Sequence, residues 1–355
     1  MAGGGTGGHV IPAIAVAREV VREGHDVLFA GTERGAEARL VRAAGFRLEL
    51  MRVGGLKNLG IATRVVSVWR LIAETFGQLR RLAEWKPTAV FSMGGYVAGP
   101  PVLAALMRGV PVVVMEPNAV PGVTNRWIAR WVRRALVSFE ETKRFFPAGR
   151  TEITGLPVRE EFFAIPAKPA SSEFTVLITG GSQGSQRLNN AARESWPLFQ
   201  QSGLPVRLIH QTGVPMFEAL KHEFAATGLP GEVSAFLADM PAAFASADLI
   251  VCRAGAGSVS ELAAAGKPSV LIPFPFAADD HQLKNAQAFE GAGAGILALD
   301  RDWNGQRFFD AVKALFEDRG RLETMGQNAR KLARPGAARR AAQILIDIAA
   351  TTPKQ

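Results

Sequence analysis

Gly3-Gly4-Gly5-Thr6-Gly7-Gly8-His9 is the first of three glycine-rich turns in this chain, and a stretch with helical periodicity follows each of them. The second is Ser92-Met93-Gly94-Gly95-Tyr96-Val97-Ala98-Gly99 and the third is Gly180-Gly181-Ser182-Gln183-Gly184-Ser185; both come directly after an apolar run. Because glycine has no Cβ, backbone N–H groups at such a turn can approach an anionic or polyhydroxyl ligand at the N-terminus of the next helix. The distribution of the turns predicts two nucleotide-binding halves that face one cleft.

Short β-rich runs alternate with helical stretches along most of the chain, which predicts an α/β fold with two parallel, doubly wound sheets. The expected strands are residues 26–30, 46–51, 89–92, 111–115, 151–154, 174–179, 206–210, 233–236, 249–252 and 269–272. Segment 155–174 is rich in proline and serine and is interpreted as the interdomain linker. The expected domains are therefore residues 1–156 and 157–336, with an alanine-rich helix at 337–352 that packs back across the first domain.

One strand is missing from the pattern at the start of the chain, where the first glycine turn already begins at residue 3. A parallel sheet without its central strand would leave backbone groups of the neighbouring strands unpaired. We therefore expect either that the natural chain begins further upstream or that this one is truncated.

The composition predicts a multi-domain enzyme with an anionic partner. A chain of 355 residues, of which 48% are hydrophobic, is large enough to build two buried cores. The net charge of +9 does not distinguish nucleic acid, anionic lipid and a phosphorylated metabolite as that partner. Cys252 is the single cysteine, and the chain opens with no secretory leader, so a reducing cytoplasm is expected. No apolar run approaches the roughly 18 residues that cross a bilayer.

The glycine turns also match the sequence patterns of two other enzyme classes. Gly3, Gly5 and Gly8 fit the G-x-G-x-x-G pattern of NAD-binding folds, and Glu33 follows the next strand at about the spacing of a ribose-binding acid. Against NAD, the first turn also carries a hydroxyl and an imidazole where dinucleotide sites usually present only backbone. A comparable turn recurs in the second half, which also disfavours a dinucleotide enzyme.

The third turn also spells G-x-S-x-G, the nucleophile pattern of α/β hydrolases, with Ser182 at the nucleophile position. Asp248 and His281 follow in the order that a hydrolase would need. His281, however, lies in a polar stretch with no feature that marks a general base. The pattern therefore favours a glycine turn whose hydroxyl and amides contact phosphate.

The stretch Cys252-Arg253-Ala254-Gly255-Ala256-Gly257-Ser258-Val259-Ser260-Glu261 leads from a strand into a helix. Its small residues and two serines offer open amides and hydroxyls to a diphosphate, and Glu261 can accept hydrogen bonds from a ribose diol. Taken alone, Glu261 would be an ordinary first-turn acid. Cys252 is expected to be a small buried strand residue, since no basic partner is evident.

No metal held by protein ligands is expected. Asp300-Arg301-Asp302 spells the D-x-D of metal-dependent sugar transferases, but Asp302 precedes a helix and resembles a cap. The five histidines show no zinc-ligand spacing.

Basic and aromatic residues interleave in residues 64–85 and 125–134. In the first stretch Val65, Val68, Trp69, Ile72, Phe76 and Leu79 share a face, with Arg70, Arg80 and Arg81 beside it. In the second, Arg126, Arg130 and Arg133 or Arg134 line up near Trp127 and Trp131. A helix facing a core would explain the apolar stripe equally well. The arginines favour a surface on anionic lipid, because no nucleic-acid module is recognisable.

Together these motifs resemble the MurG family of bacterial N-acetylglucosaminyltransferases, in order and over essentially the whole chain. The matching motifs are Gly4-Gly5-Thr6-Gly7-Gly8-His9, Met93-Gly94-Gly95-Tyr96, Glu116 with Asn118, Thr124-Asn125, Gly155 with Pro157-Val158-Arg159, residues 180–184, residues 255–261 and Asp280-His281-Gln282. The resemblance implies two Rossmann-like domains (the GT-B fold), an inverting, metal-independent transfer without a cofactor, and a peripheral place on the cytoplasmic face of the bacterial inner membrane.

The family resemblance also implies roles for individual residues. The donor diphosphate would meet Arg159, Ser182 and the turn Ala256, Gly257, Ser258, Val259 and Ser260. Glu261 and Gln282 would hold the ribose, and the backbone near Leu237 would hold uracil. Thr6, Gly7, Gly8 and Asn118 would complete the pocket around the sugar. His9 would be the general base and Glu116 a supporting acid. The family commonly has His-Glu-Gln-Asn where this chain has Met115-Glu116-Pro117-Asn118, and the proline removes one N–H donor.

The implied reaction is attack by the C4 hydroxyl of undecaprenyl-diphospho-MurNAc-pentapeptide (lipid I) on UDP-N-acetylglucosamine, which gives lipid II. The expected partners are these two substrates and an anionic membrane surface, with no nucleic acid. Two alternatives stay open: a related transferase that glycosylates diacylglycerol, and a non-catalytic protein that binds a sugar nucleotide or a lipid.

Overall fold

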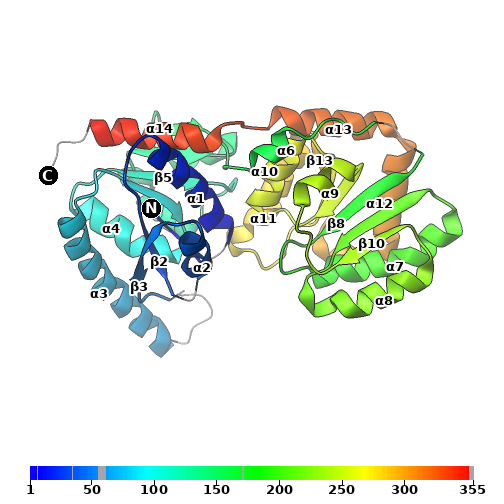
Figure 1. Ribbon diagram of the computed structural model, residues 1–355, viewed down its shortest axis with the longest axis horizontal. Coiled ribbons are helices and arrows are strands. Elements are labelled where there is room, and N and C mark those ends of the chain that lie inside the picture. Colours follow the sequence, from blue (N-terminus) through cyan, green and yellow to red (C-terminus); the bar gives the residue numbers. More distant parts are fainter. Residues whose placement is uncertain (6, 34, 55–60, 170–171, 352–355) are drawn as a thin grey trace. The chain divides into compact units, whose positions relative to one another are not determined.

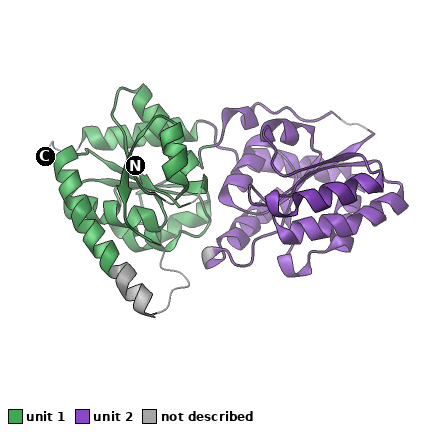
Figure 2. Cartoon of the chain, turned by 60° about the horizontal axis from the view of Figure 1, so that its bottom comes forward, with its two compact units in different colours: residues 1–157, 336–355 green, residues 158–335 purple. Residues whose placement is uncertain are grey.

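The computed structural model describes residues 1–5, 7–33, 35–54, 61–169 and 172–351. The chain divides into two compact units, which Figure 2 colours separately. Unit 1 comprises residues 1–157 and 336–355, and unit 2 comprises residues 158–335.

Unit 1 is built on a parallel seven-stranded sheet with the order β3-β2-β1-β4-β5-β6-β7 in the described residues. Its strands are β1 (Ala2–Gly3), β2 (Leu28–Thr32), β3 (Arg47–Met51), β4 (Val90–Gly94), β5 (Val112–Glu116), β6 (Arg134–Val137) and β7 (Thr151–Ile153). The central strands β4 and β5 are buried along their whole length. They therefore read as continuous apolar runs rather than as an alternating pattern.

Helices cover the sheet of unit 1 (Figure 1). They are α1 (Gly7–Arg22), α2 (Ala36–Ala43), α3 (Ile61–Trp85), α4 (Gly99–Met107), α5 (Val123–Ile128) and α14 (Ala337–Ala350), with the 3₁₀ helices η1 (Tyr96–Ala98), η2 (Ala129–Trp131) and η3 (Glu140–Phe145). The C-terminal helix α14 packs against α1, so the end of the chain belongs to unit 1 (Figure 1). Arg340 fastens it there with two hydrogen bonds to Glu152, 2.5 and 3.0 Å long.

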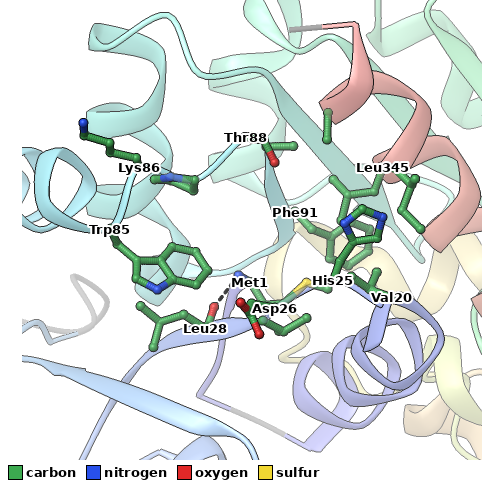
Figure 3. A pocket seen from close by; sticks show the side chains of 15 residues that line it. Met1, Val20, His25, Asp26, Leu28, Trp85, Lys86, Thr88, Phe91 and Leu345 are labelled. Carbon is green, nitrogen blue, oxygen red and sulfur yellow. Dashed lines mark hydrogen bonds between the residues drawn. The ribbon is translucent and has the colours of Figure 1, made fainter. Parts of the chain in front are cut away.

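The first strand is present as the two residues of β1, which corrects the expectation that it is missing. Ala2 pairs with Ala30 of β2 and with Ser92 of β4, so β1 occupies the central place in the sheet. Met1 lies beside a cavity of about 280 Å³, where its ammonium group donates a 2.7 Å hydrogen bond to the carbonyl of Leu28 (Figure 3). β1 leads directly into the first glycine turn.

Unit 2 is built on a parallel six-stranded sheet with the order β10-β9-β8-β11-β12-β13 in the described residues. Its strands are β8 (Phe174–Thr179), β9 (Val206–Gln211), β10 (Gly231–Ser234), β11 (Leu249–Cys252), β12 (Ser269–Leu271) and β13 (Gly295–Leu297). Its helices are α6 (Glu160–Phe163), α7 (Gln186–Ser202), α8 (Phe217–Thr227), α9 (Met240–Ser246), α10 (Ala256–Ala265), α11 (His281–Gly291), α12 (Gly305–Glu317) and α13 (Arg319–Lys331), with η4 (Val214–Met216), η5 (Ala278–Asp280) and η6 (Asp300–Asp302). In the core of the unit, Phe199 of α7 packs edge to face on Phe308 of α12.

The segment interpreted as a linker is partly structured, which is a second correction. It contains the short helix α6, whose Phe162 is fully buried and packs edge to face on Phe244. The guanidinium of Arg330 donates to the carbonyls of Phe163 and Ile165 and also to those of Ala264 and Ala265. Residues 160–165 therefore belong to the body of unit 2.

Candidate functional site

In unit 1 the candidate residues follow the carboxyl ends of three neighbouring strands. β1 leads into the first glycine turn, β4 into the second, and β5 ends at Glu116. Parallel strands end at the same edge of a sheet, so the three segments meet there. The structure brings His9 and the second turn together: a Cβ added to Gly95 would lie 3.4 Å from Nδ1 of His9.

The first glycine turn is too crowded for side chains at Gly3 and Gly4. A Cβ at Gly3 would lie 2.7 Å from Cβ of Met93, and one at Gly4 would lie 2.5 Å from the carboxylate of Glu37. Helix α1 begins at Gly7, so Gly7, Gly8 and His9 form its first turn, where N–H groups point out of the helix end. Thr6 lies outside the described residues.

His9 is placed and polarised by the backbone of that turn. Its Nδ1 lies 3.2 Å from the carbonyl oxygen of Gly4. A carbonyl only accepts, so Nδ1 carries the proton and the lone pair of Nε2 is the one that can take up another. Burial lowers the pKa of His9, while the Gly4 carbonyl and the charge of Glu37 act in the opposite direction. The imidazole is therefore neutral at neutral pH.

Glu116 is a buried carboxylate surrounded by donors. Its Oε1 accepts from the backbone and side-chain amides of Asn118, both at 3.0 Å. Its Oε2 accepts from Gly122 N at 3.1 Å and from Asn125 Nδ2 at 2.9 Å. Burial raises the pKa of Glu116, and these hydrogen bonds lower it. The carboxylate thus shapes the loop that presents Asn118. Pro117 has no N–H group, but the four hydrogen bonds to Glu116 form without it.

In unit 2 the third glycine turn connects β8 to α7. Ser185 caps α7 by accepting from Leu188 N, and a Cβ at Gly184 would lie 1.9 Å from the carbonyl oxygen of Thr212. Gly184 also has a φ of +73°, which favours glycine. The turn therefore presents Ser182 as an exposed residue just before the helix.

The first turn of α10 follows β11, the strand next to β8 in the sheet. Its N-cap is Gly255, which has no side chain to bond the N–H groups of Ala256, Gly257 and Ser258. These N–H groups and the helix dipole suit an anion. Helix α10 is ten residues long and continues through Val259, Ser260 and Glu261.

Glu261 and Arg159 form the charged part of this site. Burial raises the pKa of Glu261 to about 7, and the positive charge of Arg159 counteracts it. Arg159 precedes α6, and its guanidinium lies 5.0 Å from the centre of the Phe162 ring. Because α6 is packed into unit 2, Arg159 is held on the side of the unit where Glu261 lies.

Gln211, at the end of β9, was not anticipated from the sequence. Its Nε2 donates to Gly181 O at 3.0 Å, and its Oε1 accepts from Leu237 N at 2.9 Å. Gln211 thus connects the third glycine turn to the segment around Leu237, which is expected to hold uracil. The N–H of Leu237 donates to Gln211, so it already has a hydrogen-bond partner within the chain. Gln282 accepts from Phe274 N at 3.0 Å, so its amide is likewise oriented by backbone. A polar residue at a strand's carboxyl end was the available signal for Gln211.

The hydrolase alternative fails on geometry. Asp248 precedes β11 and accepts from Thr175 N, at the amino end of β8, and its carboxylate pairs with Lys168 at 2.5 Å. Ser182 follows the carboxyl end of β8, a strand of six residues that spans about 20 Å. The would-be nucleophile and acid therefore lie at opposite edges of the sheet.

Two further interpretations of unit 2 are settled by the structure. Asp302 is not a cap: it lies in η6, and Asn304 caps α12 by accepting from Arg307 N at 3.0 Å. Asp300 instead pairs with Arg253 at 2.5 Å. Cys252 is buried in β11, and burial raises the pKa of its thiol to about 12, so it is no nucleophile. Among the described residues there is no group of three or more His, Cys, Asp or Glu side chains that could hold a metal ion.

Comparison with known proteins identifies the family. Residues 1–137 match the glycosyltransferase family 28 N-terminal domain, and residues 175–341 match its C-terminal domain. The chain is 60% identical over 98% of its length to the UDP-N-acetylglucosamine--N-acetylmuramyl-(pentapeptide) pyrophosphoryl-undecaprenol N-acetylglucosamine transferase of Solibacter usitatus, of which it covers 95%. This chain belongs to the MurG family. It is also 39% identical to the transferase of the same description from Myxococcus xanthus, over 99% of this chain and 93% of the relative.

Solved structures agree with this membership. The crystal structure of Acinetobacter baumannii MurG matches with a TM-score of 0.81 and 32% identity, covering 97% of this chain and 98% of that one. The fold of this MurG family member is therefore the GT-B fold of two Rossmann-like units, as the sequence predicted.

Proposed function

We propose that this MurG family member transfers N-acetylglucosamine from UDP-N-acetylglucosamine to the C4 hydroxyl of undecaprenyl-diphospho-MurNAc-pentapeptide, converting lipid I into lipid II with inversion. The observation that carries the proposal is 60% identity over 98% of the chain to the transferase of Solibacter usitatus. The chemistry of the two sites supports it, since one can bind a nucleoside diphosphate and the other can accept a proton.

The donor is assigned to unit 2. The diphosphate would lie at the N-terminus of α10 with Ser182 and Arg159, where N–H groups and a guanidinium neutralise the charge that builds as UDP leaves. Glu261 would accept hydrogen bonds from the ribose hydroxyls, and the amide of Gln282 would donate to them. The backbone around Leu237 would hold uracil. No step in this scheme requires a metal ion.

The base is assigned to unit 1. His9 would take the proton of the acceptor hydroxyl on Nε2 as that oxygen attacks the anomeric carbon from the face opposite UDP, and an oxocarbenium-like centre would develop. Gly7, Gly8, Thr6 and Asn118 would surround the sugar. Glu116 would act through the loop that it shapes rather than by contact with the substrate, because its oxygens already accept four hydrogen bonds.

An acceptor-dependence assay tests the reaction. The chain is incubated with UDP-N-acetylglucosamine and either no acceptor, a lipid I analogue or diacylglycerol, and released UDP is measured. We expect release only with the lipid I analogue, and an unchanged rate after addition of EDTA. Release with diacylglycerol would instead identify the lipid glycosyltransferase, and donor binding without release a non-catalytic protein. A rate abolished by EDTA and restored by Mn²⁺ would contradict the metal-independent scheme.

Association with an anionic membrane surface is proposed for unit 1. No helix among the described residues is both long and apolar enough to cross a membrane. In α3, Trp69 and Phe76 are 68% and 63% exposed, so this part of the apolar stripe does not face a core. The side chains of Val65 and Val68 lie outside the described residues. Arg70 and Arg80 are exposed on the same helix, although Arg80 also pairs with Glu84 at 3.2 Å. Arg81 is engaged by both Glu49 and Glu74.

The second basic-aromatic surface surrounds a cavity of about 520 Å³. Trp127 and Trp131 are 64% and 46% exposed and meet edge to face. The guanidinium of Arg130 lies 4.0 Å from the centre of the Trp131 ring, and Arg126 lines the same cavity. Aromatic rings flanked by arginines suit the headgroup region of an anionic bilayer. Arg134, by contrast, is held by Gly149 O at 2.6 Å.

Charge reversal tests the membrane proposal. The double variant Arg126→Glu, Arg130→Glu should reduce sedimentation with vesicles that contain anionic lipid by about 10-fold or more, since each arginine near such a surface contributes about 1 kcal/mol. The matched control Arg321→Glu, Arg339→Glu changes the net charge equally at exposed positions that belong to neither surface. Equal binding of the two double variants to these vesicles would contradict the proposal.

A further inference from the structure

Glu37, on the first turn of α2, is fully buried against the first glycine turn. Its Oε2 accepts from Gly5 N at 2.8 Å. Its Oε1 accepts from the backbone N and the Oγ1 of Thr32, at 2.8 and 2.7 Å. The carboxylate thus bridges the glycine turn after β1 and the end of β2.

Three glycines make room for this carboxylate. A Cβ on Gly4, Gly31 or Gly35 would lie 2.5, 2.4 or 2.2 Å from an atom of the Glu37 side chain. Burial raises the pKa of Glu37, but the hydrogen bonds from Thr32 and Gly5 outweigh it and leave the pKa below its ordinary value. A full negative charge therefore lies directly behind the turn.

The peptide unit between Gly4 and Gly5 connects this charge to His9. Its N–H donates to Glu37, and its C=O accepts from Nδ1 of His9 at 3.2 Å. Both groups belong to one planar unit, so fixing the N–H also fixes the carbonyl. The carboxylate further polarises the peptide, which makes the Gly4 carbonyl a stronger acceptor.

We propose that Glu37 is a positioning residue for His9, acting through the Gly4–Gly5 peptide in the way that a carboxylate orients a catalytic histidine directly. The pairing of β1 with β4 ends at Gly3, before the turn, so Glu37 anchors a peptide unit that the sheet does not hold. The inference rests on the proposed role of His9 as the general base.

The test compares Glu37→Gln with Thr32→Val. Glu37→Gln removes the charge and places an NH₂ group, itself a donor, against the donors of Gly5 or Thr32. Thr32→Val removes one donor to Oε1 of Glu37 and leaves the hydrogen bond from Gly5 intact. We expect Glu37→Gln to lower kcat about 10- to 100-fold, by analogy with residues that orient metal-bound histidines, with an unchanged KM for UDP-N-acetylglucosamine. Thr32→Val should keep kcat within about twofold, although both variants lower the melting temperature.

A double-variant cycle separates positioning from general loosening. In a His9→Ala background, Glu37→Gln should have no further effect on the residual rate, since the group that it positions is gone. Full kcat in Glu37→Gln, or an equal loss in the His9→Ala background, would overturn the proposal. If Glu37→Gln does not fold, Glu37→Asp replaces it: its shortened carboxylate cannot reach both Gly5 and Thr32, and the same loss of kcat is expected. A wild-type rate in His9→Ala alone would instead refute the base itself.

Discussion

His9→Ala is expected to lower the single-turnover rate of sugar transfer by about 10²- to 10⁴-fold, the contribution of a positioned general base. The imidazole is the group that combines a fixed tautomer with a neutral state at neutral pH, because Nδ1 is held by Gly4 O and burial lowers the pKa of the ring. Donor binding should survive, since the nucleotide is assigned to unit 2. The affinity of His9→Ala for UDP is measured by calorimetry, and its single-turnover rate is measured in parallel.

The pH dependence follows from the direction of that shift. A base must be unprotonated, so the rate should rise with pH while His9 loses its proton, and it should level off below the ordinary histidine value of 6.5. The matched control is His222→Ala, at an exposed position on α8, which should leave both the rate and the pH profile unchanged. Equal rates in the two alanine variants would remove His9 from the mechanism.

The sequence predicted several of the strands that are buried on both faces. Residues 174–179 and 249–252 agree with β8 and β11 to the residue, because central parallel strands read as short apolar runs. It missed β6, which opens with Arg134, and β13, which opens with Gly295. These are strands of four and three residues whose pairing comes from the rest of the sheet rather than from their own composition.

Within the candidate sites, the sequence pointed to residues that follow strands or open helices. It could not point to Glu37, which looks like any acid in the first turn of a helix. What distinguishes Glu37 is its surroundings: Gly4, which is far away in sequence, and the nearby Gly31 and Gly35 leave a space that its side chain fills. The role of Gln211 could not be predicted either, since its partners Gly181 and Leu237 are far away in sequence.

Glu261→Gln is expected to stabilise the chain at alkaline pH and to weaken donor binding at the same time. The folded-state pKa of this carboxyl is raised from 4.5 to about 7, so the folded state holds a proton that the unfolded state releases. Stability from this group is therefore full below pH 4.5 and is lost as the pH rises to about 7. At about 1.36 kcal/mol per pKa unit, the loss approaches about 3 kcal/mol at pH 8.

A glutamine at position 261 does not titrate, so it avoids that loss. The melting temperature of Glu261→Gln should exceed that of the parent chain at pH 8 and match it near pH 4. UDP should bind about 10-fold more weakly, because a charged acceptor for the ribose hydroxyls becomes a neutral one. The control Glu232→Gln, at an exposed position on β10, should change neither quantity.

The two effects together separate a binding residue from a structural one. A buried acid that serves only the fold would be replaced at a cost in stability, and donor affinity would not change. An acid that must ionise to bind its ligand lowers the stability of the empty site above its raised pKa. The bound ribose restores this stability through hydrogen bonds that only the ionised form makes fully. If Glu261→Gln bound UDP as tightly as the parent chain, the ribose assignment would fail even though the melting temperature had risen at pH 8.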